Sequence, residues 1–250
     1  MSTKGIADVV FCIDASASMA PCIDAVRANI ESFIEGLTGN SQQTWDLRVE
    51  FIAHHAGETP DGGGVFAHRS LHESELLEVL YQNKGKQGRL FTADIGEFSR
   101  GLKGVSVEGD EAPLVALDFC LDLPWRSSAA CHRVVIMLTD EPFEQSARQA
   151  FQREQLAQLI SKIHDLRVML FLVAPNSELF DELASADGSE YEVIDQIGTG
   201  MANVNFAEVL KYIGKSISAS TLQSPTKPTV KRGLYQQATW GLTNHQVTGR

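Results

Sequence analysis

The sequence has few cysteines, fewer basic than acidic residues and no long hydrophobic run. Its four cysteines have neither CxxC nor zinc-ligand spacing, which argues against a disulfide framework and against a structural zinc site. No apolar run reaches the roughly 20 residues that a membrane-spanning helix needs, and the first residues have no apolar signal region. We therefore expect a cytoplasmic protein with reduced cysteines and no membrane partner.

Basic residues are outnumbered by acidic ones, 21 against 32, and the net charge is −11 at pH 7. Binding to a nucleic-acid backbone depends on clustered lysines and arginines that release counterions from the phosphates, so this chain is a poor candidate for it. The charge is compatible with a divalent cation or with a basic protein partner. The composition therefore excludes one class of partner without identifying another.

The last segment, residues 222–250, differs from the rest in composition. It contains two lysines, two arginines and no acidic residue, so it carries +4 while the remainder carries −15. We interpret residues 1–221 as one domain and residues 222–250 as a basic C-terminal tail. Such a tail can fold loosely over the acidic body, or it can be an arm that docks a partner.

Motifs of catalysis and of phosphate binding are also missing. The sequence contains no GxSxG nucleophile elbow, no Walker GxxxxGK[ST] loop and no Ser-His-Asp order. The run Gly62-Gly63-Gly64 lacks the following helix and lysine of a phosphate loop, and we interpret it as a turn. We therefore expect that the protein has no catalytic residues and is not an enzyme.

Four histidines could converge near one edge of the fold, namely His54, His55, His68 and His72. Histidine suits zinc, but no cysteines or carboxylates with matching spacing accompany them. We interpret them as ordinary surface or hairpin residues.

Short apolar runs alternate with amphipathic patterns along the chain. Nearly continuous apolar runs, typical of strands buried on both faces, occur at 7–14, 133–139 and 167–174. Weaker strands are predicted at 47–54, 65–67 and 191–194, and helices at 23–37, 73–82, 94–103, 112–122, 146–164 and 205–219. This order predicts an α/β fold with a doubly wound, mainly parallel sheet of six strands, one of which is an antiparallel edge strand. The predicted core face of the helix at 146–164 comprises Phe151, Leu156, Leu159, Ile160 and Ile163.

The segment Asp14-Ala-Ser16-Ala-Ser18 follows the first buried run and opens a helix. The carboxylate of Asp14 and the hydroxyls of Ser16 and Ser18 stand on alternate residues, so they can point toward one cation. Such oxygen ligands suit Mg²⁺ or Mn²⁺ rather than zinc or copper. The N-terminal end of the helix disfavours a cation, so further carboxylates must come from elsewhere. Asp140 ends another buried run and Asp110 precedes a helix. Taken alone, the loop is more simply a helix cap and turn.

Three segments in order resemble the von Willebrand factor type A (vWA) family, over about residues 6–220. VVFCIDASASM resembles the family's strand that runs into DxSxS, and VVIMLTDEPF resembles its later strand that ends in an aspartate. GVSVEGDEAPLVALDFCLDLPWR resembles its middle segment. The resemblance is to the bacterial cytoplasmic type. It implies a Rossmann-like sheet of strand order 3-2-1-4-5-6, with a metal-ion-dependent adhesion site at its carboxyl edge.

The resemblance also implies roles for individual residues. Ser16 and Ser18 would be direct ligands of a Mg²⁺ (or Mn²⁺) ion, and Asp14 and Asp140 would bind it directly or through water. The best-known members place a threonine in the middle segment, and this chain departs from that pattern.

At the threonine's place the chain offers Asp110, with Glu111 or Ser106 as substitutes. A direct aspartate ligand would cancel part of the cation's charge. We therefore expect Asp110 to hold the metal more firmly and to reduce the demand for an acidic ligand from a partner.

The resemblance implies a metal-dependent protein-binding module, a scaffold or adaptor in an intracellular signalling or stress-response pathway. Two alternatives stay open. One is a Mg²⁺-dependent phosphohydrolase that forms an aspartyl-phosphate, although such enzymes generally have a second acid where this chain has Ser16. The other is a vWA fold with an unused metal site, which would bind its partner through the tail or the acidic surface.

Overall fold

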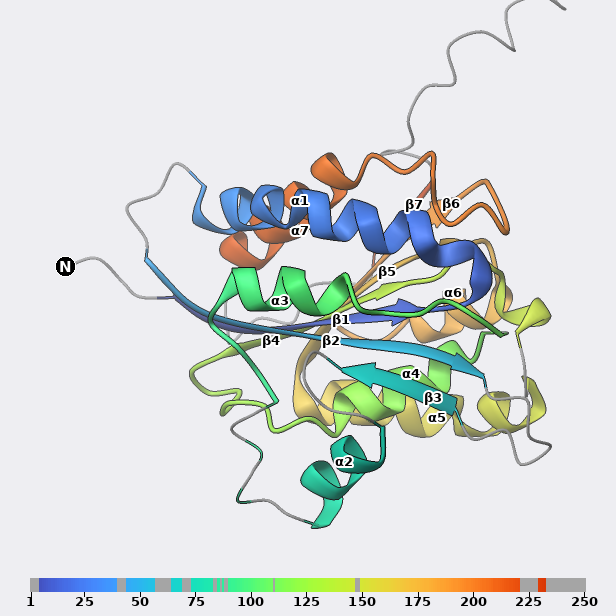
Figure 1. Cartoon of the computed structure of the whole chain (residues 1–250), viewed down its shortest axis with the longest axis horizontal. Coiled ribbons are helices and arrows are strands. Elements are labelled where there is room, and N and C mark those ends of the chain that lie inside the picture. The colour runs from blue at the N-terminus through green and yellow to red at the C-terminus, as the bar shows by residue number, and fades with distance from the viewer. Residues whose placement is uncertain are drawn as a thin grey trace, which may run out of the picture.

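A largely parallel sheet, built from the apolar runs of the sequence, organises the chain (Figure 1). The computed structural model describes residues 5–39, 44–56, 64–68, 73–82, 85, 87, 90–109, 111–146, 149–220 and 229–232. The strands are β1 (Gly5–Asp14), β2 (Trp45–Ala56), β3 (Gly64–His68), β4 (His132–Leu138), β5 (Val168–Pro175), β6 (Ser189–Ile194) and β7 (Thr229–Arg232). Within the described residues they form one seven-stranded sheet in the order β3-β2-β1-β4-β5-β6-β7.

The pairing confirms a mainly parallel α/β sheet. β1 lies between β2 and β4, and β4, β5, β6 and β7 follow in parallel. β3 runs antiparallel to β2 at the other edge. The predicted count of six strands is wrong, because residues 229–232 of the expected tail form β7 and pair with the backbone of β6, which would otherwise be an edge strand. The rest of the 222–250 segment lies outside the described residues.

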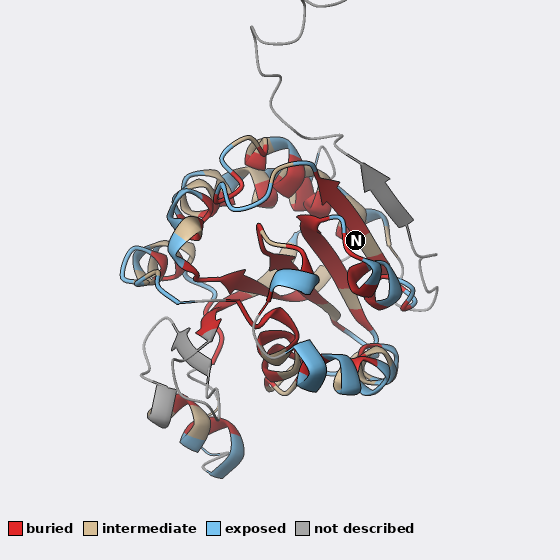
Figure 2. Cartoon of the chain, turned by 90° about the vertical axis from the view of Figure 1, so that its right-hand side faces the viewer, coloured by how far each residue is buried: buried red, intermediate tan, exposed pale blue. Residues whose placement is uncertain are grey.

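Helices cover both faces of the sheet (Figures 1 and 2). They are α1 (Ala20–Thr38), α2 (Glu73–Leu77), α3 (Ile95–Leu102), α4 (Pro113–Leu121), α5 (Gln149–Leu166), α6 (Glu178–Leu183) and α7 (Phe206–Ala219). α1, α3 and α7 pack on one face, and α4, α5 and α6 pack on the other. None of the described helices combines the length and the apolar character needed to cross a membrane.

Aromatic rings and close helix packing fill the layer under α1, α3 and α7. The ring of Phe11 in β1 lies 6.1 Å from that of Phe33 in α1 and 5.3 Å from that of Phe98 in α3, measured between centroids. α1 and α7 approach each other at two glycines. A Cβ on Gly36 would lie 2.1 Å from the Lys211 carbonyl oxygen, and one on Gly214 would lie 2.4 Å from that of Phe33. The C-terminal half of α1 is therefore packed tightly against β1 and α7.

The carboxyl ends of the parallel strands meet at one edge of the sheet. After β1 the chain adds β2 and β3 on one side, and it then crosses to place β4 on the other side of β1. Such a change of winding direction is where ligands bind in open α/β sheets. Asp14 ends β1 at this point, and Thr139 and Asp140 directly follow β4. The fold therefore brings the predicted Asp14 and Asp140 to the same place.

Candidate metal centre

Asp14 is the buried carboxylate that links the ends of β1 and β4. Its Oδ1 accepts the backbone N–H of Ser16 at 2.7 Å, and its Oδ2 accepts the hydroxyl of Thr139 at 2.9 Å. Burial raises the pKa of Asp14 to about 7, with a contribution from the charge of Asp140, although the hydrogen bonds from Ser16 and Thr139 act in the opposite direction. An uncompensated negative charge at this carboxyl is therefore costly, and a cation would relieve it.

Ser16 and Ser18 turn their hydroxyls toward each other, with 3.3 Å between the two Oγ atoms. Ser18 also donates to Oδ1 of Asp140 at 3.0 Å. Ser16 stands at the N-cap of the short 3-10 turn Ala17–Met19, yet its side chain makes no capping hydrogen bond within the described part of the chain. The helix-cap reading of this loop therefore does not account for its hydroxyls.

Asp140 is fully buried and is held by a loop that the sequence analysis did not single out. Its Oδ2 accepts the backbone N–H of Gly200 at 2.5 Å, and its carbonyl oxygen accepts that of Gly198 at 2.9 Å. Gly200 has a φ of +61°, and a Cβ there would lie 2.1 Å from the Ser18 carbonyl oxygen. The only sequence signal for this contact is the Gly-Thr-Gly spacing after β6.

Glu111 completes an acidic group with Asp14 and Asp140. One carboxylate oxygen from each of the three residues lies within 4.8 Å of the others, and all three residues are buried. Burial and the charge of Asp14 raise the pKa of Glu111 to about 8; Glu141 adds to the rise and a hydrogen bond with Ser16 opposes it. Of the other middle-segment candidates, Asp110 lies outside the described residues and Ser106 is exposed. Asp110 therefore stays a prediction, while Glu111 is the residue found beside Asp14.

The donor set fits a hard divalent cation. Three carboxylates and two hydroxyls are oxygen ligands, which Mg²⁺ and Mn²⁺ prefer over the nitrogen and sulfur ligands favoured by zinc and copper. Among the described residues, this is the one group of three or more acidic, histidine or cysteine side chains close enough to share a metal. The predicted ligands Asp14, Ser16, Ser18 and Asp140 are thus brought together.

His54 and His55 lie in the antiparallel β2–β3 pair, so the hairpin interpretation is confirmed for them, but both are buried and neither is a surface residue. β2 is an inner strand of the sheet, between β3 and β1. His54 is the register partner of Asp14, and Nε2 of His55 lies 3.6 Å from Oε1 of Glu108. The His68 side chain and all of His72 lie outside the described residues. Neither His54 nor His55 belongs to the acidic group.

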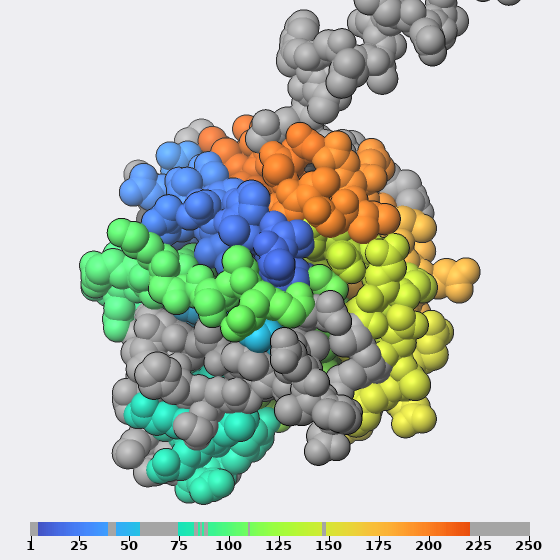
Figure 3. Space-filling view, turned by 45° about the vertical axis from the view of Figure 1, so that its right-hand side comes forward, coloured from blue at the N-terminus to red at the C-terminus, as the bar shows by residue number. Residues whose placement is uncertain are grey.

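The edge that carries the acidic group is built from four separate parts of the chain. Figure 3 shows the start of α1 (blue), the segment around α3 (green), the residues after β4 (yellow-green) and the loop before α7 (orange) coming together on this side. A small pocket next to Asp14 is lined also by Cys12, His54, Ala112 and Pro113. The site is therefore assembled by the fold rather than by one continuous segment.

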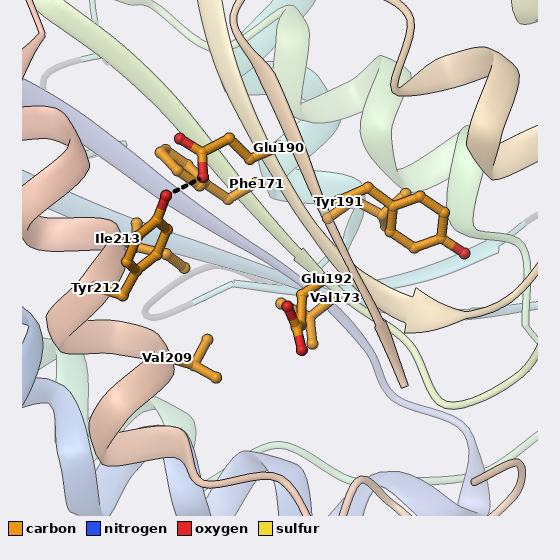
Figure 4. Close-up of a pocket in the computed structure, with 9 residues that line it drawn as sticks. Phe171, Val173, Glu190, Tyr191, Glu192, Val209, Tyr212 and Ile213 are labelled. Atoms are coloured by element: carbon orange, nitrogen blue, oxygen red, sulfur yellow. Dashed lines mark hydrogen bonds between the residues drawn. The ribbon is translucent and has the colours of Figure 1, made fainter. Parts of the chain in front are cut away.

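A second pocket lies under α7, away from the acidic group (Figure 4). It is lined mainly by apolar side chains of β5, β6 and α7, and the hydroxyl of Tyr212 donates to Glu190 at 2.6 Å beside it. None of its lining residues belongs to the acidic group. It offers no chemistry that would connect it with the candidate metal centre.

Comparisons with known proteins establish the fold. No protein-family model matches the sequence, and no curated protein matches it. A von Willebrand factor type A protein from Catenulispora acidiphila matches the structure with a TM-score of 0.54 and 17% sequence identity, over 87% of this chain and 44% of that one. Proximal thread matrix protein 1 from the mussel byssus matches with a TM-score of 0.52 and 14% identity, over 91% of this chain and 49% of that one.

This chain spans less than half the length of either matched protein. At these identities the likeness concerns the fold alone. The likeness confirms a vWA-like fold for this chain. The structure adds a buried acidic group at the edge of the sheet where the family resemblance predicted a metal site.

Proposed function

We propose that this chain is a metal-dependent protein-binding module that holds Mg²⁺ (or Mn²⁺) at Asp14, Ser16, Ser18 and Asp140. The observation that carries the proposal is the hydrogen-bonded path from Asp14 through the serine loop to Asp140, at the edge where the sheet changes its winding direction. A resident cation supplies positive charge that neutralises these buried carboxylates and offers a contact to a partner. Ser18 is only half-buried, so the site borders the surface.

Binding is a better account of the site than catalysis. An aspartyl-phosphate enzyme needs a carboxylate oxygen that a phosphate substrate can reach, but only 7% of Asp14 is exposed. Such enzymes generally have a second acidic residue two positions after the first, but this chain has Ser16 two positions after Asp14. We therefore propose a non-catalytic role. Steady phosphate release from an aryl phosphate that is lost in Asp14→Asn would contradict it.

The partner that we propose is a protein. The net charge of −11 argues against nucleic acid, and the family resemblance supports a cytoplasmic scaffold or adaptor in a signalling or stress-response pathway. A partner recognised through the metal should bind in Mg²⁺ and be released by EDTA. If a partner binds as well in EDTA as in Mg²⁺, and binds Ser18→Ala as well as the wild type, that result would support the alternative of a vWA fold with an unused metal site.

Thermal unfolding with Mg²⁺, Mn²⁺ or EDTA tests the metal site directly. A ligand that binds only the folded state stabilises it by RT ln(1 + [L]/Kd), about 2.7 kcal/mol at one hundred times Kd. We expect a higher Tm in Mg²⁺ than in EDTA for the wild type, and a much smaller difference for Ser16→Ala. The matched control is Ser106→Ala, because Ser106 is exposed and should leave the shift unchanged. Equal Tm values for the wild type in Mg²⁺ and EDTA would overturn the proposal.

A further inference from the structure

The position of Glu111 is set by contacts on both sides of it. Before it, the backbone N–H of Glu108 donates to the carbonyl oxygen of Ala15 at 2.9 Å, which ties the middle segment to the serine loop. After it, α4 begins at Pro113. Glu111 is 5% exposed. Its carboxylate is therefore placed beside Asp14 by the backbone and is not a surface side chain that happens to swing inward.

Capping of α4 does not explain a buried glutamate here. Near the start of that helix, the backbone N–H of Leu114 is accepted by Oε1 of Gln152 from α5 at 2.8 Å. Gln152 is itself fully buried. A side chain from another helix thus performs the capping role that an acidic residue near a helix start commonly has, whereas the Glu111 carboxylate lies with Asp14 and Asp140.

The charges around the candidate metal centre indicate which side chains of a partner it can accept. Two carboxylates balance the two positive charges of a divalent cation, and a third leaves a net negative charge. Glu141 also acts electrostatically on Glu111. A carboxylate from a partner would therefore meet a site that is already negative, while a basic or neutral side chain would not be repelled.

We propose that Glu111 is a carboxylate ligand that the chain supplies to its own metal, in the coordination position that an acidic partner residue would otherwise fill. This inference rests on the proposed function, because it presupposes that a divalent cation binds. It changes the expected partner: the surface around the metal selects a basic or neutral segment and does not select an acidic one.

Titration of the protein with Mn²⁺, followed by calorimetry and by water proton relaxation, tests this role. We expect Glu111→Gln to weaken Mn²⁺ binding by about tenfold or more, and to increase the relaxivity per bound ion because water replaces the lost ligand. In Glu111→Ala, added acetate should restore part of the affinity. Glu108→Gln is the matched control, since its carboxylate is exposed, and it should bind Mn²⁺ like the wild type.

The outcomes separate the two proposals. If Mn²⁺ binds the wild type and Glu111→Gln equally, Glu111 is not a ligand and the proposed function stands. If the wild type binds no Mn²⁺, the proposed function fails. A Tm measured in EDTA detects a purely structural role: we expect Glu111→Gln to match or exceed the wild type there, because one of three clustered carboxylates is removed. A marked loss of Tm in EDTA would overturn the ligand role.

Discussion

The hydroxyl of Thr139 donates a hydrogen bond of 2.9 Å to Oδ2 of Asp14, and it joins the end of β4 to that of β1. Both residues are buried, Thr139 at 1% exposure and Asp14 at 7%. The bond fixes the plane of the Asp14 carboxylate, because the other oxygen accepts the Ser16 N–H. The two strand ends and the serine loop are thus coupled through one side chain.

Replacing Thr139 with valine should therefore affect both stability and metal binding. Valine has nearly the same shape but leaves Oδ2 of Asp14 without this donor, and an unsatisfied buried polar group costs about 1–3 kcal/mol. We expect urea denaturation to show that loss in EDTA, together with a smaller Mg²⁺-induced rise in Tm. Thr139→Ser keeps the hydroxyl and should retain the Mg²⁺ response. If the valine and serine variants respond alike to Mg²⁺, the hydroxyl does not orient Asp14.

A pair of glycines in the loop after β6 allows a second matched test. Gly198 and Gly200 both have positive φ, +65° and +61°, so an alanine at either costs roughly 1–2 kcal/mol of backbone strain. Only at Gly200 would the new Cβ also meet the Ser18 carbonyl oxygen, whereas no atom of the described residues lies within 4 Å of a Cβ at Gly198. We expect Gly200→Ala to lose much of the Mg²⁺-dependent shift in Tm, and Gly198→Ala to keep it. Equal responses to Mg²⁺ in the two variants would show that this contact does not position Ser18.

The opposite end of β1 carries a buried ion pair that predicts acid sensitivity. Asp8 is fully buried and accepts hydrogen bonds from Arg48 at 2.8 and 2.6 Å and from the side chain of Arg126 at 2.7 Å. Burial alone would raise the pKa of Asp8, but the hydrogen bonds and charges of the two arginines outweigh it and hold the pKa below its usual 3.8. The stability from this carboxylate is therefore present above pH 3.8 and is lost as the pH falls through the lower folded-state value.

Asp8→Asn should accordingly destabilise the fold at pH 7 by about 3–5 kcal/mol, because it leaves two arginines without their buried partner. The difference from the wild type should shrink as the pH is lowered below about 4. Urea denaturation across this pH range measures both effects. Asp24→Asn breaks an exposed pair with Arg27, and it should cost about 1 kcal/mol or less. A pH-independent cost for Asp8→Asn would mean that its charge is not the source of the stability.

Much of the sheet and of the candidate site could be predicted from the sequence, because both depend on local patterns. Apolar runs mark the inner strands, and the ends of parallel strands share one edge, so the positions of Asp14 and Asp140 followed. β7 could not be predicted, since four residues with little apolar character pair only because β6 offers a free backbone edge. The Gly200 contact was missed for a related reason: a backbone N–H leaves no mark in a side-chain pattern.

Helical periodicity also failed at one position, where tertiary contacts decide burial. The pattern placed Phe151 on the core face of α5, but Phe151 is 47% exposed, whereas its neighbour Gln152 is fully buried. The amide oxygen of Gln152 accepts the Leu114 N–H near the start of α4. A polar side chain thus takes the buried position because it satisfies a helix terminus that would otherwise be buried without a partner.

Gln152→Leu should therefore destabilise the protein even though it adds apolar volume to the core. The Leu114 N–H would lose its acceptor in a buried place, at a cost of about 1–3 kcal/mol. Because α4 begins two residues after Glu111, we also expect faster amide hydrogen exchange across the first turn of α4. Gln158→Leu, on the exposed side of the same helix, is the control and should change both quantities little. If Gln152→Leu were as stable as the wild type, with unchanged exchange at Leu114, the capping role would be wrong, and the start of α4 would have to be held by its apolar packing alone.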